Sequence, residues 1–147
     1  MLQNPDLKAF AQSHHEIDAP TYAKGHACII GDAAHCMTPW QGSGAGQAIE
    51  DVMILAALLE RVQDPRRLTA AFRAYDHVRR PRSQRIIHSS AGTGVIMCGR
   101  GPDTGLDIAK IQELLPGRWD FIYNHNLLDY KKEALLTFEK FLKDAEL

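Results

Sequence analysis

Apolar residues form one short run and one longer run in the first half of the chain. The run at residues 27–30 is β-rich and is followed by Gly31 and Asp32, so it predicts a short strand that ends in a turn. The run at residues 48–59 consists mostly of good helix formers and is apolar on nearly every face. Since a helix that is hydrophobic all round is normally buried, we expect a buried helix over residues 46–61.

The second half of the chain predicts further helices. Asp64 and Pro65 start one that runs toward residue 87 or beyond. Pro81 lies inside this pattern and is expected to kink the helix or to end it near Arg80.

Loops and shorter helices are expected on either side of these elements. Residues 89–105 are rich in glycine, serine and threonine and predict a loop around residues 99–103. Short helices are predicted at residues 106–115 and 119–123, and a last helix begins near residue 128. At the N-terminus, Asn4 and Pro5 predict a helix start. The last helix carries an apolar stripe made of Leu135, Phe138 and Leu142.

Together these elements predict a mainly α fold with one or two short β-strands. Residues 1–62 hold the strand, a glycine-rich loop and the buried helix, and residues 63–147 form a C-terminal helical segment. The helices of the C-terminal segment are expected to serve packing and an interface, since they offer no residues of obvious chemical use.

Length and charge limit the classes of function. A chain of 147 residues with 45% hydrophobic content is long enough for one domain with a core. The formal net charge of −1 gives no general attraction to nucleic acid or to an anionic membrane. The longest apolar run, at residues 52–59, is far shorter than the ~20 residues that span a bilayer. We therefore expect a soluble protein with neither of these partners.

Cysteines and adjacent histidines do not predict a metal site. Cys28, Cys36 and Cys98 are an odd number of thiols whose spacing matches neither a metal knuckle nor a C-x-x-C motif. We interpret them as reduced, buried thiols of a cytoplasmic protein, and no signal peptide is evident in the first residues. His14 and His15 are adjacent, and adjacent side chains on a helix or strand point apart.

The glycine-rich loop differs from the Rossmann dinucleotide fingerprint. That fingerprint places G-x-G-x-x-G directly after a strand and an acidic residue about 20 positions later. Here the glycines at residues 42–46 have a different spacing and lie well past the predicted strand, while Asp32 precedes them.

The same stretch resembles the second flavin-contacting motif of the FAD-dependent aromatic hydroxylases, which include salicylate-hydroxylase-like monooxygenases. The resemblance rests on the order Gly31-Asp32-Ala33-Ala34-His35, Pro39, the glycines at residues 42–46, and Glu50-Asp51, and it continues through Tyr75 and residues 79–85.

The resemblance implies which residues contact FAD. Asp32 is expected to accept a hydrogen bond from a ribityl or ribose hydroxyl. The backbone N–H groups at the start of the helix are expected to face the N1–C2=O2 edge of the flavin ring, where a helix N-terminus stabilises negative charge. Trp40, where many relatives have histidine, is expected to narrow the space beside the ring. The implied cofactor-binding residues are Gly31, Asp32, Pro39, Gly42, Gly44, Ala45 and Gly46.

The resemblance covers only the C-terminal portion of such an enzyme. The N-terminal Rossmann half, which binds the ADP part of FAD in an α/β monooxygenase, is absent from the sequence, so a truncated fold is expected. In the family, NAD(P)H reduces FAD and the reduced flavin uses oxygen to hydroxylate or epoxidise an activated aromatic ring. The cofactor carries that reaction, so catalytic side chains stay unassigned.

Two functions follow, and a third, weaker alternative is a purely structural or regulatory subunit or a gene fragment. In the first, the chain contributes the ribityl and ring-binding motif to an FAD-dependent monooxygenase with a small aromatic substrate, completed by an N-terminal FAD-domain chain. In the second, it is an FAD-free homo-oligomer that binds a small molecule or acts without a cofactor, because the apolar helix needs a cover.

Simpler structural roles exist for several of these residues. Asp32 suits a helix cap after a turn, and Glu50 and Asp51 suit the positive end of a helix dipole. His35 is expected to pack or to cap a loop. The arginines at residues 66–85 are expected to form a solvated helix face, although the resemblance implies structural roles for Arg79 and Arg82.

Overall fold

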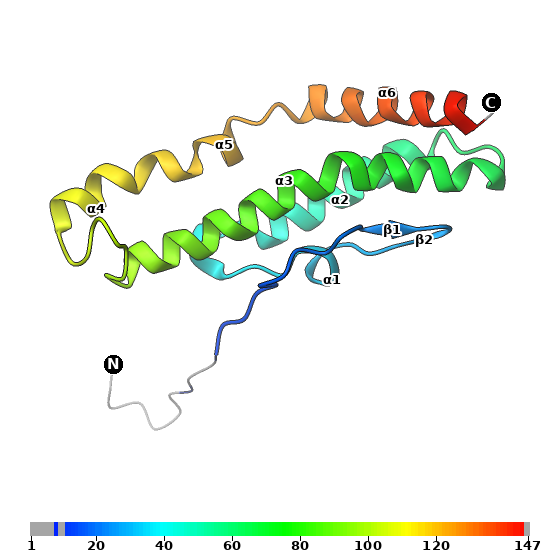
Figure 1. Ribbon diagram of the computed structural model, residues 1–147. Helices are drawn as coiled ribbons and strands as arrows, with labels where there is room; N and C mark the ends of the chain where they lie inside the picture. Colours follow the sequence, from blue (N-terminus) through cyan, green and yellow to red (C-terminus); the bar gives the residue numbers. More distant parts are fainter. Residues whose placement is uncertain (1–7, 9–10, 146–147) are drawn as a thin grey trace.

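The computed structural model describes residue 8 and residues 11–145, so the helix start expected at Asn4 and Pro5 lies outside the described residues. The described chain is mainly helical, with one two-stranded sheet (Figure 1). In chain order the elements are β1 (Ala23–Lys24), β2 (Ala27–Cys28), α1 (Asp32–His35), the 3₁₀ turn η1 (Pro39–Gln41), α2 (Gly44–Leu59), η2 (Pro65–Arg67), α3 (Leu68–Met97), α4 (Ile108–Leu114), η3 (Pro116–Trp119), α5 (Asp120–Tyr123) and α6 (Leu127–Ala145).

Three helices build the core. The long helix α3 packs against both α2 and α6, while the β1–β2 hairpin and α1 lie on the side of α3 away from α6 (Figure 1). Tyr130, Ala134 and Phe138 are buried along one stripe of α6, and Leu135 and Leu142 pack against this core while remaining partly buried. The amphipathic pattern of the last helix therefore predicts its packing face correctly.

The sheet is a β-hairpin of two short strands, whereas the sequence analysis located one strand at residues 27–30. β1 and β2 are antiparallel, with Ala23 opposite Cys28 and Lys24 opposite Ala27. Gly25 makes the turn with φ +59°, a conformation that glycine adopts without steric cost. The two residues before Gly25 thus supply the first strand. After β2 the chain is held by the Tyr75 hydroxyl, which donates to the Ile29 carbonyl at 3.0 Å.

Helix α3 has 30 residues and continues through Pro81, so of the two alternatives expected there, a kink or an end near Arg80, the end near Arg80 is wrong. A proline inside a helix costs roughly 3 kcal/mol because it removes one backbone hydrogen bond and crowds the preceding turn. Burial of Val78 and Ser83 on either side of the proline, on the face toward the core, offsets that cost. The same packing keeps residues 89–97 helical although they are rich in glycine, serine and threonine, and the loop predicted around residues 99–103 follows the end of α3 at Met97.

Helix α2 begins at Gly44, two residues before its predicted start, and is buried on one face only. Ile54 and Leu58 are fully buried, whereas Ile49 is 70% exposed and Val52 is 56% exposed. The prediction of burial on every side is therefore wrong for this chain. We call the exposed surface formed by Ala48, Ile49, Val52 and Met53 the apolar face of α2.

Two further sequence expectations concern the burial of the cysteines and the ability of the helices to cross a membrane. All three cysteines are free thiols, but Cys28 and Cys36 are only partly buried and Cys98 is exposed, so the expected burial is wrong. Within the described part of the chain, each helix is too short or too polar to cross a bilayer.

Candidate functional site

The turn after β2 is fixed by a side chain from α2. Gly31 has φ +58° and ψ −141°, a backbone conformation open to glycine, and Asp32 then begins α1. The Gly31 N–H donates to Asp51 Oδ2 at 2.9 Å, and a Cβ on Gly31 would lie 3.8 Å from the Ala48 Cβ. The carboxylate of Asp51 therefore holds the Gly-Asp turn against the first half of α2.

Asp51 belongs to a buried group of ionisable side chains, which we call the ion cluster and which is formed by His35, Glu50, Asp51, Arg79 and Arg82. Arg79 is 0% exposed and donates through Nε to Asp51 Oδ1 at 2.7 Å and through Nη1 to Glu50 Oε2 at 2.6 Å. Arg82 donates to both oxygens of Glu50, at 2.7 and 2.8 Å. Such pairing is what allows charges to stay ionised away from water.

The ion cluster reaches further into α2 and toward α1. Arg79 Nη2 donates to both the backbone and the side-chain oxygen of Gln47, each at 2.9 Å. His35 Nε2 lies 2.6 Å from Asp51 Oδ2, and because an ionised carboxylate can only accept, Nε2 carries the proton of this bond. His35 thus has a buried structural role, in agreement with the sequence interpretation.

Both acids of the ion cluster remain ionised. For Asp51, burial by itself raises the pKa, but the His35 hydrogen bond, the Arg79 charge and the Gly31 N–H together lower it below its usual value. For Glu50, burial likewise raises the pKa, and the hydrogen bond and charge of Arg82 with the charge of Arg79 lower it overall.

This direction of shift predicts a loss of stability in acid. A carboxylate with a lowered pKa in the folded state contributes stability that is complete above the unfolded pKa, about 3.9 for Asp and 4.3 for Glu. That contribution falls as the pH drops through the folded values. In urea unfolding, we expect the contribution of these two carboxylates to be constant between about pH 7 and pH 5 and the free energy of unfolding to decline from pH 5 toward pH 3.

An Asp51→Asn variant is the comparison for this pH series. Its stability at pH 7 is expected to be lower and its decline in acid shallower, because one titrating group is gone. A parent protein that becomes more stable between pH 5 and pH 3 contradicts the assignment of lowered pKa values.

The N-terminus of α2 presents donors without a capping side chain. The first backbone N–H groups of a helix have no partner within the helix. Ser43 precedes the helix but does not cap it, because its hydroxyl donates to the Gln41 carbonyl at 3.1 Å. Ala45 and Gly46 are exposed, and a Cβ on Gly46 would meet no atom within 4 Å. The residues present therefore fit an acceptor edge of a flavin placed at this helix end.

Asp32 follows Gly31, the residue that contacts Ala48 and Asp51 of α2. Its side chain is exposed and makes no hydrogen bond with any residue that the structure describes, and α1 has no side-chain cap. The capping role for Asp32 is therefore not observed. The dipole role for Glu50 and Asp51 is also wrong, because α2 starts earlier than predicted and both acids lie beyond its first turn.

The turn η1 carries Pro39 and Trp40 between α1 and α2. Pro39 is exposed, and Gly42 ends the turn with φ +63°. The Trp40 indole packs closely over Gly94 of α3, where a Cβ would overlap it. The Trp40 indole therefore packs against α3. This contact limits how far the side chain can project into the space beside a ligand.

Replacing Gly94 with valine is expected to displace Trp40 and to destabilise the protein by about 1–3 kcal/mol, because overpacking a closely fitted contact forces shifts. Urea unfolding measures the change, and tryptophan fluorescence reports the indole environment. In a Trp40→Ala background the same substitution is expected to cost much less. An equal cost in both backgrounds means that Gly94 matters for another reason.

The C-terminal segment holds η1 in place, which sequence reasoning missed. The Gln41 side chain donates to the Arg118 carbonyl at 2.8 Å, and Trp119 Nε1 donates to the Gln41 carbonyl at 3.2 Å. Arg118 is itself tied to α3 through Thr93 Oγ1 at 2.7 Å and the Ser89 carbonyl at 2.8 Å. No local sequence pattern marks these contacts, since they join residues 77 and 78 positions apart.

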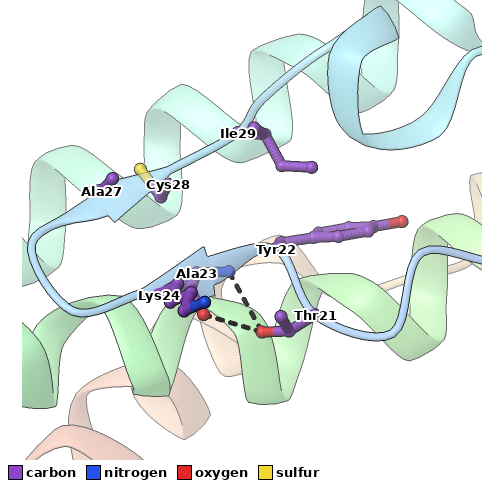
Figure 2. A pocket seen from close by; sticks show the side chains of 7 residues that line it. All are labelled: Thr21, Tyr22, Ala23, Lys24, Ala27, Cys28 and Ile29. Carbon is purple, nitrogen blue, oxygen red and sulfur yellow. Dashed lines mark hydrogen bonds between the residues drawn. The ribbon is translucent and has the colours of Figure 1, made fainter.

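A small pocket at the β-hairpin contains a cysteine thiol in its lining. This pocket has a volume of about 170 Å³ and is lined by residues of the hairpin and its flanks, among them Tyr22 and Ile29 (Figure 2). Cys28 is also in the lining, and burial followed by the charge of Asp51 raises the pKa of its thiol. The thiol therefore stays protonated and is a poor nucleophile.

The arginines of α3 divide into two groups. Arg79 and Arg82 are buried or nearly so and belong to the ion cluster, so the expected solvated face is wrong for them. Arg73 and Arg85 are exposed, as that expectation predicts.

Comparisons with known proteins give a consistent result. A family model described as "FAD binding domain" matches residues 6–90. A salicylate hydroxylase from Pseudomonas putida is 42% identical over 115 residues, covering 78% of this chain and 26% of that protein. A 6-methylsalicylate 1-monooxygenase from Aspergillus terreus is 33% identical over 138 residues, covering 94% of this chain and 30% of that protein.

A solved structure agrees with these sequence matches. The salicylate hydroxylase in its substrate complex superposes with a TM-score of 0.76 at 37% identity, covering 80% of this chain and 29% of that chain. The chain therefore spans between 26% and 30% of the length of these relatives.

Proposed function

Because this chain belongs to the FAD-binding-domain family of salicylate-hydroxylase-like flavin monooxygenases, we propose that it supplies the ring-edge part of a flavin site. By family resemblance the cofactor is FAD. The observation that carries the proposal is the exposed, uncapped start of α2, with the free carboxylate of Asp32 on the adjoining α1. A helix N-terminus and an acceptor for hydroxyl groups suit the ring and ribityl parts of one molecule.

Each residue of the proposed site has a stated task. The N–H groups of Gly44, Ala45 and Gly46 bind the N1–C2=O2 edge and stabilise negative charge on it. Asp32 accepts a hydrogen bond from a ribityl or ribose hydroxyl. The N–H of Gly31 donates a hydrogen bond to Asp51, and this contact keeps the adjacent Asp32 in position.

The turn before α2 forms the side of the proposed site nearest the substrate. Pro39 and Trp40 border the flavin face, and Gly42 lets the chain reverse into α2. FAD supplies the redox chemistry when it is bound, taking electrons from NAD(P)H and using oxygen to hydroxylate an activated aromatic ring. The protein positions the cofactor and shields it from water.

The rest of the fold completes the site, either on the same polypeptide or on a second one. In the proposed assembly, the N-terminal FAD-binding portion covers the apolar face of α2. That face is unusually apolar for a free surface, since Ile49 and Val52 lie together in it with Ala48 and Met53. The substrate class proposed from the relatives is a small hydroxylated benzoate.

A titration with FAD tests this proposal. The chain is mixed with the N-terminal FAD-binding portion of a salicylate hydroxylase. The visible absorbance of bound flavin is then recorded. Saturable binding by the mixture is expected, and Asp32→Asn is expected to weaken it by roughly tenfold, as for one hydrogen bond to a charged group.

The matched control is Asp103→Asn, which makes the same change on an exposed loop outside the site. The control is expected to bind FAD like the parent. Equal weakening by both variants, or no flavin binding by the mixture, overturns the proposal.

A second function remains as an alternative because the apolar face of α2 also suits a second copy of this chain. In that case the chain forms an FAD-free homo-oligomer that binds a small molecule. Its solution mass distinguishes the two: a stable dimer or larger assembly that ignores FAD supports the alternative, and a monomer that binds the N-terminal portion supports the first proposal.

A further inference from the structure

A polar groove lies at the junction of β1, α3 and α6. Its volume is about 330 Å³, roughly ten times the ~30 Å³ that one water occupies in the liquid. We call it the arginine groove; the residues that matter for its chemistry are Thr21, Arg73, Asp76, His77, Arg80 and Phe141. None of these belongs to the proposed flavin site.

Arg73 is held in this groove by an aromatic ring. Its guanidinium lies over Phe141, 4.4 Å from the ring centroid. The His77 ring packs edge-on against the same phenylalanine, with centroids 6.0 Å apart. Stacking orients the guanidinium but uses none of its N–H donors. Within the described chain, no carboxylate or carbonyl accepts a hydrogen bond from Arg73, so its donors are available.

Arg80 is held by a different contact. Its Nε donates to Asp76 Oδ1 at 3.0 Å, and the same oxygen accepts from the Tyr22 N–H at 2.7 Å. Asp76 is thus occupied by the backbone of the hairpin and by one edge of Arg80. The two Nη groups of Arg80 make no hydrogen bond to any described residue and remain for a ligand.

The groove therefore holds two guanidinium groups and one carboxylate, with an imidazole beside them. Arg73 and Arg80 are seven residues apart on one helix, which places their Cα atoms about 10 Å apart along the axis. Their long side chains both line the same groove. A planar guanidinium binds phosphate oxygens in pairs, and each arginine is already oriented by its own contact.

We propose that the arginine groove binds an anion with two linked phosphate groups, the chemistry shared by a nucleoside diphosphate and by inorganic pyrophosphate. Each guanidinium binds one phosphate group. Thr21 and His77 border the groove and line the path between the two phosphates. A single phosphate engages one arginine only and binds more weakly.

Isothermal titration of the full chain with sodium pyrophosphate at low ionic strength tests this site. One saturable site is expected, with affinity for pyrophosphate at least about tenfold above that for inorganic phosphate. Arg73→Gln is expected to weaken pyrophosphate binding roughly tenfold or more while leaving the melting temperature nearly unchanged. Arg80→Gln provides a second, independent variant at the other end of the groove.

The chain offers a close control in Arg85→Gln. Arg85 is exposed on the same helix and stacks on Phe121 at 4.1 Å, so this variant removes the same charge and the same kind of aromatic contact outside the groove. It is expected to bind pyrophosphate like the parent. Equal weakening by Arg73→Gln and Arg85→Gln, equal affinity for phosphate and pyrophosphate, or absence of a saturable site overturns the proposal.

A parallel titration with ADP distinguishes the two sources of the diphosphate group. Tighter binding of ADP than of pyrophosphate identifies a nucleotide, and the reverse identifies the free anion. No residue of the arginine groove belongs to the flavin site. A failure to bind pyrophosphate therefore leaves the proposed function unaffected, and a failure to bind FAD leaves the proposed pyrophosphate site unaffected.

Discussion

Replacing Arg79 with methionine is expected to lower the free energy of unfolding by about 3–5 kcal/mol, the usual cost of removing one partner from a buried ion pair. Arg79 has no solvent exposure and its guanidinium neutralises both Asp51 and Glu50. Without it, Asp51 loses its guanidinium partner and retains the hydrogen bonds with His35 and the Gly31 N–H. A loss of this size is a large part of the total stability of a domain, which is about 5–15 kcal/mol. Urea unfolding at pH 7 measures it.

Two companion variants make this result specific. Arg85→Met removes a charge from an exposed position of the same helix and is expected to change stability by less than about 1 kcal/mol. Arg79→Lys keeps the charge but loses the planar fork, so an intermediate loss is expected. If Arg79→Met unfolds like Arg85→Met, the ion cluster does not stabilise the fold in the way described.

The double substitution Ile49→Asp and Val52→Asp is expected to abolish assembly of the chain with the N-terminal FAD-binding portion. Burial of each apolar side chain contributes about 1.5–3 kcal/mol to association, and a buried, unpaired charge costs several more. Together these effects weaken binding by roughly a thousandfold or more. Both positions are largely exposed in this chain, at 70% and 56%, so the variant itself is expected to fold. Co-purification and the absorbance of bound flavin provide the readouts.

The same double substitution on another exposed apolar pair is the control. Leu128 and Leu136 of α6 are 73% and 72% exposed and lie outside the apolar face of α2. Aspartate at both of these positions is expected to leave assembly intact. Assembly that survives the α2 substitutions, or that is lost equally with the α6 substitutions, shows that the apolar face of α2 is not the contact surface.

Local sequence patterns identified the elements from which this site is built. The order of Gly31, Asp32, Pro39 and the glycines of residues 42–46 predicts a turn, a second turn and a helix start, and the structure has all three. The stripe of α6 also follows from the helical period alone. These features depend on residues within one or two turns of each other, so the sequence displays them directly.

Helix boundaries near glycine and proline were the least predictable local features. α3 runs through Pro81 and through a segment rich in glycine and serine because its face is packed against α2, α6 and η1. Intrinsic preference works against a helix there, and burial outweighs it. The extent of that burial depends on helices that are distant in sequence.

The sequence by itself determined the family motif, the mainly helical fold and the presence of a helix that starts within the glycine-rich stretch, although not the residue at which it starts. Only the tertiary structure decided that Arg79 lies opposite Asp51, 28 residues away, and that Trp119 reaches Gln41, 78 residues away. It also decided which face of α2 is buried and which stays exposed. The physical reason is that a motif is encoded by neighbouring residues, whereas a buried charge is acceptable only where distant segments bring it a partner.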